Sequence, residues 1–199
     1  MIKRLLHLHR NQKGYTLVEL MVSFTLTAIF MTAAVLVMSS FLKVYYRTNN
    51  IAQTTSVSDM LMENITSELS LAALSSWDGS EGAPAIQITK GSDEKDSIGY
   101  CDKNGNSVIM NVSDGRIQLK YLAQVENGAA VTSEINWGYT ENVYVNNKIT
   151  KLTFNRDGND MITVELSLYN KKTGYTDNTK RVIKCFNMES SADIVQSGT

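Results

Sequence analysis

Hydrophobic residues form one long run near the start of the chain. Residues 21–42 contain no charged side chain, and Glu19 is the only charge in the apolar stretch that leads into them. Because a transmembrane helix needs about 20 apolar residues, this length predicts a membrane span over residues 15–42. No Gly or Pro occurs from Tyr15 to Asp78. The absence of helix breakers predicts that the span continues as one long helix.

The hydrophobic pattern changes after Lys43, where polar residues become frequent. Apolar positions then recur at spacings of four and three, with Met60 and Leu71 beside them. They are Val57, Leu61, Ile65, Leu69 and Ala72. Such spacing is typical of one face of an amphipathic helix. We therefore predict that residues 43–77 form the outer half of the same helix and that its segment 57–72 covers a globular head.

Residues 78–199 alternate between apolar and polar positions, which predicts half-buried antiparallel strands. The candidate strands are 85–89, 97–101, 107–112, 116–125, 131–137, 149–155, 161–169 and 180–186. Asn-Gly or Asp-Gly pairs at 104–105, 114–115, 127–128 and 157–158 indicate hairpin turns. We expect Ile149–Phe154 to pair with Ile162–Leu168, and the polar tail 190–199 to be frayed. The predicted fold class is α+β, a long N-terminal helix packed on an antiparallel β-sheet head.

Charge is distributed unevenly along the chain. Residues 1–14 carry four basic side chains and no acidic one, whereas the chain from Lys43 onward has a net charge of −4. By the positive-inside rule, a basic leader stays in the cytoplasm and the head is exported. An ordinary secretory signal would have a shorter apolar region followed by a small-residue cleavage site, which this stretch lacks. We therefore expect a retained anchor, giving a single-pass protein of the cytoplasmic membrane.

A short motif joins the leader to the apolar run. It reads Gly14-Tyr15-Thr16-Leu17-Val18-Glu19-Leu20. A glycine, an aromatic residue and a glutamate at these spacings, after a basic leader, resemble the N-terminus of type IV pilins and pseudopilins. The resemblance implies that a prepilin peptidase cleaves between Gly14 and Tyr15 and methylates the new amine of Tyr15. It also implies that the apolar helix assembles with other pilin subunits as the spine of a filament.

Glu19 is the most unusual residue of the apolar stretch. A carboxylate at mid-membrane costs roughly 2.5–3.5 kcal/mol on insertion scales. A charged residue kept at this depth is therefore expected to have a functional role. We expect its partner in assembly to be the positive amine of Tyr15, most usefully that of a neighbouring subunit. The alternative is that Glu19 complements the N-terminus of its own helix, an effect of roughly 0.3–1 kcal/mol.

Small and hydroxyl residues interrupt the apolar run and have two possible roles. They are Ser23, Thr25, Thr27, Thr32, Ala33 and Ala34. Small residues let helices approach closely in lipid, and hydroxyls bond across such contacts. Alternatively, the hydroxyls bond the backbone of their own helix.

The chain has two cysteines, Cys101 and Cys185, both in the exported part. An oxidising compartment permits a disulfide between them. In the loop-entropy model, closing the loop between these two residues would stabilise the fold by roughly 4 kcal/mol. The alternative is a pair of buried thiols, because Cys also packs as a small hydrophobe.

The sequence gives little support to catalysis or metal binding. The only histidines, His7 and His9, lie in the leader, so a mature chain beginning at Tyr15 has none. This excludes histidine acid–base chemistry and His–zinc sites from the mature chain. The segment Asp102–Asn106 resembles the start of a calcium loop, but its glycine comes at the fourth position and Ser113 occupies the twelfth. We expect a hairpin turn there, no cofactor, no small-molecule substrate and no enzymatic activity.

The head also carries basic residues around Tyr175, namely Lys171, Lys172, Lys180 and Arg181. Basic side chains beside an aromatic one can bind nucleic acid. The head's net charge of −4 makes a broad nucleic-acid surface unfavourable, because phosphate attraction dominates non-specific binding.

The function that we expect is that of a minor pilin or minor pseudopilin. The filament could serve a type IV pilus, type II secretion, DNA uptake in competence, or cell adhesion. One alternative is a membrane-anchored extracellular binding protein, an adhesin or DNA receptor outside any filament. Another is a tethered enzyme, which the lack of a catalytic motif disfavours.

Overall fold

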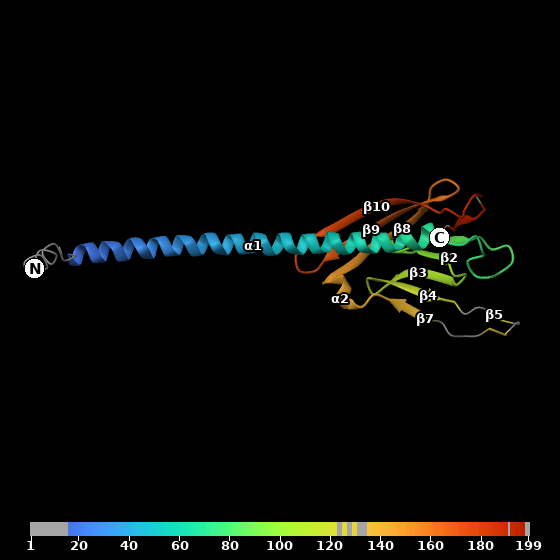
Figure 1. The fold of residues 1–199 in the computed structure, drawn as a ribbon, viewed down its shortest axis with the longest axis horizontal. Coiled ribbons are helices and arrows are strands. Elements are labelled where there is room, and N and C mark those ends of the chain that lie inside the picture. The colour runs from blue at the N-terminus through green and yellow to red at the C-terminus, as the bar shows by residue number, and fades with distance from the viewer. Residues whose placement is uncertain (1–15, 123–124, 127–128, 131–134, 191, 198–199) are drawn as a thin grey trace, which may run out of the picture. The chain divides into compact units, whose positions relative to one another are not determined.

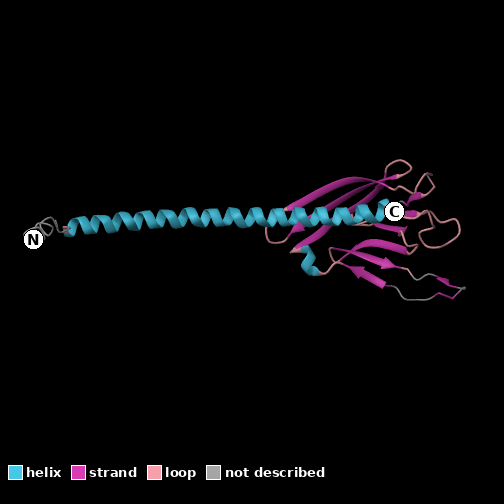
Figure 2. Cartoon of the chain, in the orientation of Figure 1, coloured by secondary structure: helices cyan, strands magenta, loops and turns pink. Residues whose placement is uncertain are grey.

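The computed structural model describes residues 16–122, 125–126, 129–130, 135–190 and 192–197. The chain divides into two units, Met1–Thr48 and Asn49–Thr199. One helix, α1 (Leu17–Ser70), contributes residues to both units. Strands and one short helix make up the rest of the second unit (Figures 1 and 2). The predicted α+β class is confirmed.

Two main sheets form the second unit. The first has the order β11-β1-β2-β3-β4-β7 and the second β10-β9-β8. The strands of the first sheet are β1 (Ile86–Thr89), β2 (Ser97–Cys101), β3 (Ser107–Ser113), β4 (Arg116–Tyr121), β7 (Ile135–Gly138) and β11 (Ile194–Ser197). Those of the second are β8 (Asn147–Arg156), β9 (Met161–Asn170) and β10 (Thr176–Lys184). A two-residue pair, β5 (Val125–Glu126) with β6 (Ala129–Ala130), and the short helix α2 (Glu141–Tyr144) lie outside these sheets.

The face of α1 that the sequence predicts to be buried is buried against the sheets. It consists of Val57, Leu61, Ile65 and Leu69, none of them more than 9% exposed, and Ala72, just beyond the end of the helix, is buried as well. Thr54, Ser58 and Met62 on the same helix are also fully buried. In Figure 1 the last turns of α1 lie in front of both sheets, with β8–β10 on one side and β3, β4 and β7 on the other. The helix therefore joins the two sheets into one hydrophobic core.

Local turn chemistry sets the antiparallel register. The predicted hairpin is confirmed, since Ile149 pairs with Leu168 and Phe154 with Val164. Asp114 and Gly115 connect β3 to β4, and both have positive φ, at 52° and 74°. An Asp-Gly pair tolerates that conformation, because Asp adopts the left-handed backbone region more readily than most residues and Gly has no Cβ. The predicted turn at 127–128 lies outside the described residues.

The helix ends at Ser70 and not at residue 77 as the pattern predicted. Beyond Ser70 the backbone pairs with the strands. The Ala73 amide donates to the Cys101 carbonyl at 2.8 Å, and the Phe186 amide donates to the Ser70 carbonyl at 3.1 Å. The ring of Trp77 lies over Gly99 so closely that a Cβ there would collide with it. Tertiary hydrogen bonds thus replace the helical ones over residues 71–77.

The C-terminal tail was predicted to be frayed, and this is wrong for residues 194–197. They form β11, which pairs in parallel with β1, placing Ile194 beside Ile86. The Ile194 side chain is fully buried, and the Ile86 amide donates to the Asp193 carbonyl at 2.8 Å. Burial of this one apolar side chain and the pairing of its backbone explain why the tail is ordered here.

A buried carboxylate links the first sheet to the second. Asp96 is 2% exposed. Its Oδ2 accepts a hydrogen bond from Lys90 Nζ and another from the Phe154 amide, each at 2.9 Å. Its Oδ1 accepts one from the Gly91 amide at 3.1 Å. One acidic side chain thus satisfies a cation and two backbone donors from both sheets.

We expect Asp96→Ala to lower the free energy of unfolding by about 3 kcal/mol, because it leaves Lys90 and the Phe154 amide without their shared partner. Chemical denaturation of the full chain in an uncharged detergent measures this. Glu81→Ala is the control, since Glu81 is exposed in a loop, and its effect should stay within about 0.5 kcal/mol. Equal losses in the two variants would contradict the prediction.

Candidate assembly site

The first unit presents an apolar helix with no cover. Every residue from 16 to 49 is exposed, including Phe24 and Phe30 at 74% each. Helix α1 is long and apolar enough to cross a membrane. Contiguous apolar surface of this extent is rare on a soluble monomer and indicates contact with lipid or with other apolar helices.

The helix begins with a reciprocal pair of hydrogen bonds between Thr16 and Glu19. Glu19 Oε2 accepts from the Thr16 amide at 3.0 Å and from the Thr16 hydroxyl at 3.1 Å. The Glu19 amide in turn donates to Thr16 Oγ1 at 3.3 Å. This arrangement is a capping box, which satisfies amides that have no partner at the start of a helix. The carboxylate is thereby turned back toward the N-terminus.

Thr16 is the residue of this site that the sequence analysis missed. The signal for it was present, because Thr-x-x-Glu directly before an apolar run is the sequence signature of a capping box. The structure brings Thr16 and Glu19 together. Gly14 and Tyr15, the predicted cleavage and methylation positions, lie outside the described residues. Pairing of Glu19 with the Tyr15 amine therefore stays a prediction.

The hydroxyl groups of the apolar run bond the backbone of their own helix. Ser23 and Thr27 donate to the carbonyls of Glu19 and Ser23, each at 2.8 Å. Thr25 donates to the Val22 carbonyl at 2.9 Å, and Thr32 to the Ile29 carbonyl at 2.8 Å. Satisfied hydroxyls cost little in lipid, so the helix keeps a nearly apolar surface.

Cys101 and Cys185 are free, buried thiols in place of the predicted disulfide. Cys101 ends β2 in the first sheet, and Cys185 directly follows β10 in the second. Burial raises the pKa of both thiols, that of Cys185 to about 12, and Asp102 adds to the rise for Cys101. Because the thiolate is the reactive form, these side chains act as small hydrophobes of the core.

The calcium-like segment is a hairpin turn. Asp102 Oδ1 accepts from the amides of Asn104 and Asn106 at 2.8 Å each, and its Oδ2 accepts from Asn106 Nδ2 at 2.9 Å. The carboxylate is therefore occupied by its own turn. Within the part of the chain that the structure describes, no group of three or more His, Cys, Asp or Glu side chains could hold a metal ion.

The basic residues near Tyr175 do not act as one cluster. Lys180 pairs with Glu165 at 3.0 Å, and Arg181 pairs with Glu63 of α1 at 2.8 Å. Two of the four basic side chains thus have acidic partners within the head, which weakens their attraction for phosphate groups.

Comparison with known proteins bears on the N-terminal segment. The family described as "Prokaryotic N-terminal methylation motif" matches residues 9–35. No curated protein matches the chain. The matched range contains the basic end of the leader, the capping box and most of the apolar segment. The motif supports a type IV pilin-like chain processed by prepilin peptidase, and together with the apolar helix it supports anchoring in a membrane.

Proposed function

We propose that this protein is a minor pilin or minor pseudopilin, a structural subunit of a type IV pilus or of a related filament for type II secretion or DNA uptake. The observation that carries the proposal is the methylation motif at the start of an exposed, membrane-length helix. The motif provides the processing site, and the helix provides a surface that only lipid or other subunits can cover.

In this proposal the helix serves two environments in turn. The basic leader holds the N-terminus in the cytoplasm while the apolar segment spans the membrane, with the head outside. Prepilin peptidase removes residues 1–14 and methylates the amine of Tyr15. The helix then leaves the lipid and packs against the apolar helices of neighbouring subunits. Its hydroxyls already bond their own backbone, so the transfer from lipid to a helix bundle exposes no unsatisfied donor.

The head then has a structural role and no catalytic one. Its two sheets share one core with the outer half of α1, and the carboxylates Asp96 and Asp102 are used within the fold. A head with one hydrophobic core suits a subunit that is added to a filament as a whole.

The test is the chemistry of the mature N-terminus. Protein extracted from the membranes of its own cells should begin at Tyr15 and carry one methyl group on its amine, as read by N-terminal sequencing and mass spectrometry. Purified filaments should contain the same chain. A chain that still begins at Met1, or that is cut beyond Leu42, would refute the proposal. A processed chain absent from every filament would favour the anchored adhesin or DNA receptor.

A further inference from the structure

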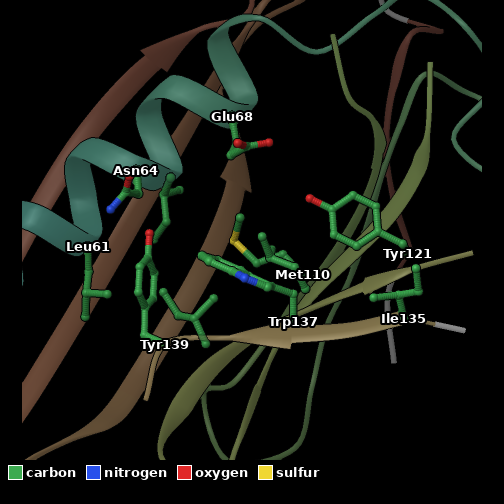
Figure 3. Close-up of a pocket in the computed structure, with 11 residues that line it drawn as sticks. Leu61, Asn64, Glu68, Met110, Tyr121, Ile135, Trp137 and Tyr139 are labelled. Atoms are coloured by element: carbon green, nitrogen blue, oxygen red, sulfur yellow. The ribbon is translucent and has the colours of Figure 1, made fainter. Parts of the chain in front are cut away.

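A pocket of about 460 Å³ lies in the head between α1 and the first sheet. Leu61, Asn64 and Glu68 line it from the helix, and Met110, Tyr121 and Trp137 line it from β3, β4 and β7. Figure 3 shows the sheet residues below the helix, with Glu68 projecting over the space between them. The volume is within the range of small-molecule sites, roughly 300–1,000 Å³, and the lining is mostly apolar.

Aromatic rings form the part of the pocket opposite the helix. In Figure 3 Trp137 is seen between Tyr139 and Tyr121. Trp137 and Tyr139 meet edge to face, with ring centroids 4.9 Å apart and an interplanar angle of 67°. Trp137 is nevertheless 47% exposed, because β7 is the edge strand of the first sheet. An indole held in place by a neighbouring ring, with nearly half its surface open, is available to a ligand.

The pocket contains one charge, that of Glu68. This carboxylate is half-buried, and its Oε2 accepts a hydrogen bond from the Tyr100 hydroxyl at 3.2 Å. Among the described residues Glu68 has no ion pair, unlike Glu63 of the same helix. Burial and the negative charge of Glu68 both raise the pKa of Tyr139 and of Tyr121. Both tyrosines of the pocket therefore feel the negative charge of Glu68, and Asp102 adds to its effect at Tyr121.

We propose that this pocket binds a small organic ammonium ion, with Glu68 as counter-charge and Trp137 with its neighbouring tyrosines as the aromatic wall. Ring faces attract cations, Trp most strongly, and aromatic cages hold quaternary ammonium groups in this way. A neutral ligand of the same shape would desolvate Glu68 without compensating its charge, and an anion would be repelled. The ligand is bound and not converted, so the pocket adds a recognition role to the structural one.

The experiment compares two probes of equal shape, choline and its uncharged isostere 3,3-dimethylbutan-1-ol. The full chain is held in an uncharged detergent, and the two probes are titrated while tryptophan fluorescence is followed. Trp137 is the reporter in the pocket, and Trp77, over Gly99, is the second tryptophan. We expect choline to bind at least about tenfold more tightly than the isostere, because it adds a cation–π contact and a charge pair.

Variants separate the charge from the rings. Glu68→Gln keeps an oxygen that can accept from Tyr100 and should weaken choline binding about tenfold. The isostere should bind this variant at least as tightly as the parent, because it no longer desolvates a carboxylate. Asp59→Asn removes the same charge from an exposed position of the same helix and should change neither affinity. Trp137→Leu lacks the fluorescent reporter, so its choline affinity is measured by titration calorimetry, as is that of the parent. It should be weaker than the parental affinity, with unchanged circular dichroism. The proposal is overturned if choline and the larger benzyltrimethylammonium both fail to bind, if choline and the isostere bind equally, or if Glu68→Gln binds choline like the parent.

Discussion

A Gly14→Leu chain is expected to remain at the mass of the uncut precursor in cells that process the parent chain fully. Gly14 is the last residue of the proposed leader and lies inside the matched methylation motif. A protease that draws the backbone close to its catalytic groups needs a residue without a Cβ there, and Leu adds a branched side chain at the scissile bond. Immunoblotting and intact-mass measurement of membrane extracts distinguish precursor from mature chain.

Two comparisons make this prediction specific. Gly14→Ala adds one methyl group only and should be cut faster than Gly14→Leu. Gln12→Leu introduces the same bulk two residues earlier and should be processed like the parent. Cleavage of Gly14→Leu at the parental rate would show that the peptidase does not recognise this glycine.

The parts of the fold that follow from local sequence were predictable. The buried face of α1 follows from the spacing of Leu61, Ile65 and Leu69, because a helix of 3.6 residues per turn brings such positions together. The pairing of β8 with β9 follows from alternation around Asp157-Gly158. In both cases the residues that carry the pattern belong to the helix or hairpin that the pattern specifies.

The features that the sequence did not predict depend on distant contacts. The end of α1 at Ser70 depends on a carbonyl of β2 and an amide that follows β10. Strand β11 has only four residues, and its partner β1 is the first strand of the head, far from it along the sequence. No periodicity within residues 71–77 or 190–199 contains that information, since the hydrogen-bonding partners belong to other segments.

The candidate sites show the same division. Glu19 was recognisable from the sequence as a charge in an apolar run. Its hydrogen bonds with Thr16 could be predicted only by recognising the Thr-x-x-Glu pattern as a capping box. The pocket beneath α1 gathers Glu68, Tyr121 and Trp137 from three separate elements. Their alignment is a product of the β4–β7 pairing and of the helix position, so the linear sequence gives no spacing rule for it.

We expect Glu19→Gln to lower incorporation into filaments at least about tenfold, while cleavage after Gly14 proceeds normally. The proposed partner of Glu19 is the positive amine of Tyr15 on a neighbouring subunit. An isolated charge at membrane depth costs roughly 2.5 kcal/mol or more, so docking that pairs two such charges removes two costs at once. Removing one partner leaves the other unpaired, which is a loss of well over tenfold in an equilibrium.

Because Glu19 is part of a capping box, its replacement by Gln separates the effect of the charge from that of the helix cap. Glu and Gln both serve at this position of a capping box, so Glu19→Gln keeps the side chain that reaches back to Thr16 and removes its charge. If Glu19 only complemented its own helix N-terminus, the loss would be roughly 0.3–1 kcal/mol, about two- to fivefold. Thr16→Ala is the matched control, because it removes the hydroxyl of the cap and leaves the charge of Glu19 in place.

The measurement is the yield of crosslinks between this chain and its filament neighbours in the three backgrounds, normalised to the amount of processed protein. Intersubunit pairing requires Glu19→Gln to be much more defective than Thr16→Ala, because the charge and not the cap makes the contact. If Thr16→Ala were as defective as Glu19→Gln, the helix cap would be the feature that assembly needs. If Glu19→Gln were incorporated like the parent, Glu19 would act only at the end of its own helix, and subunits would be registered by apolar packing alone.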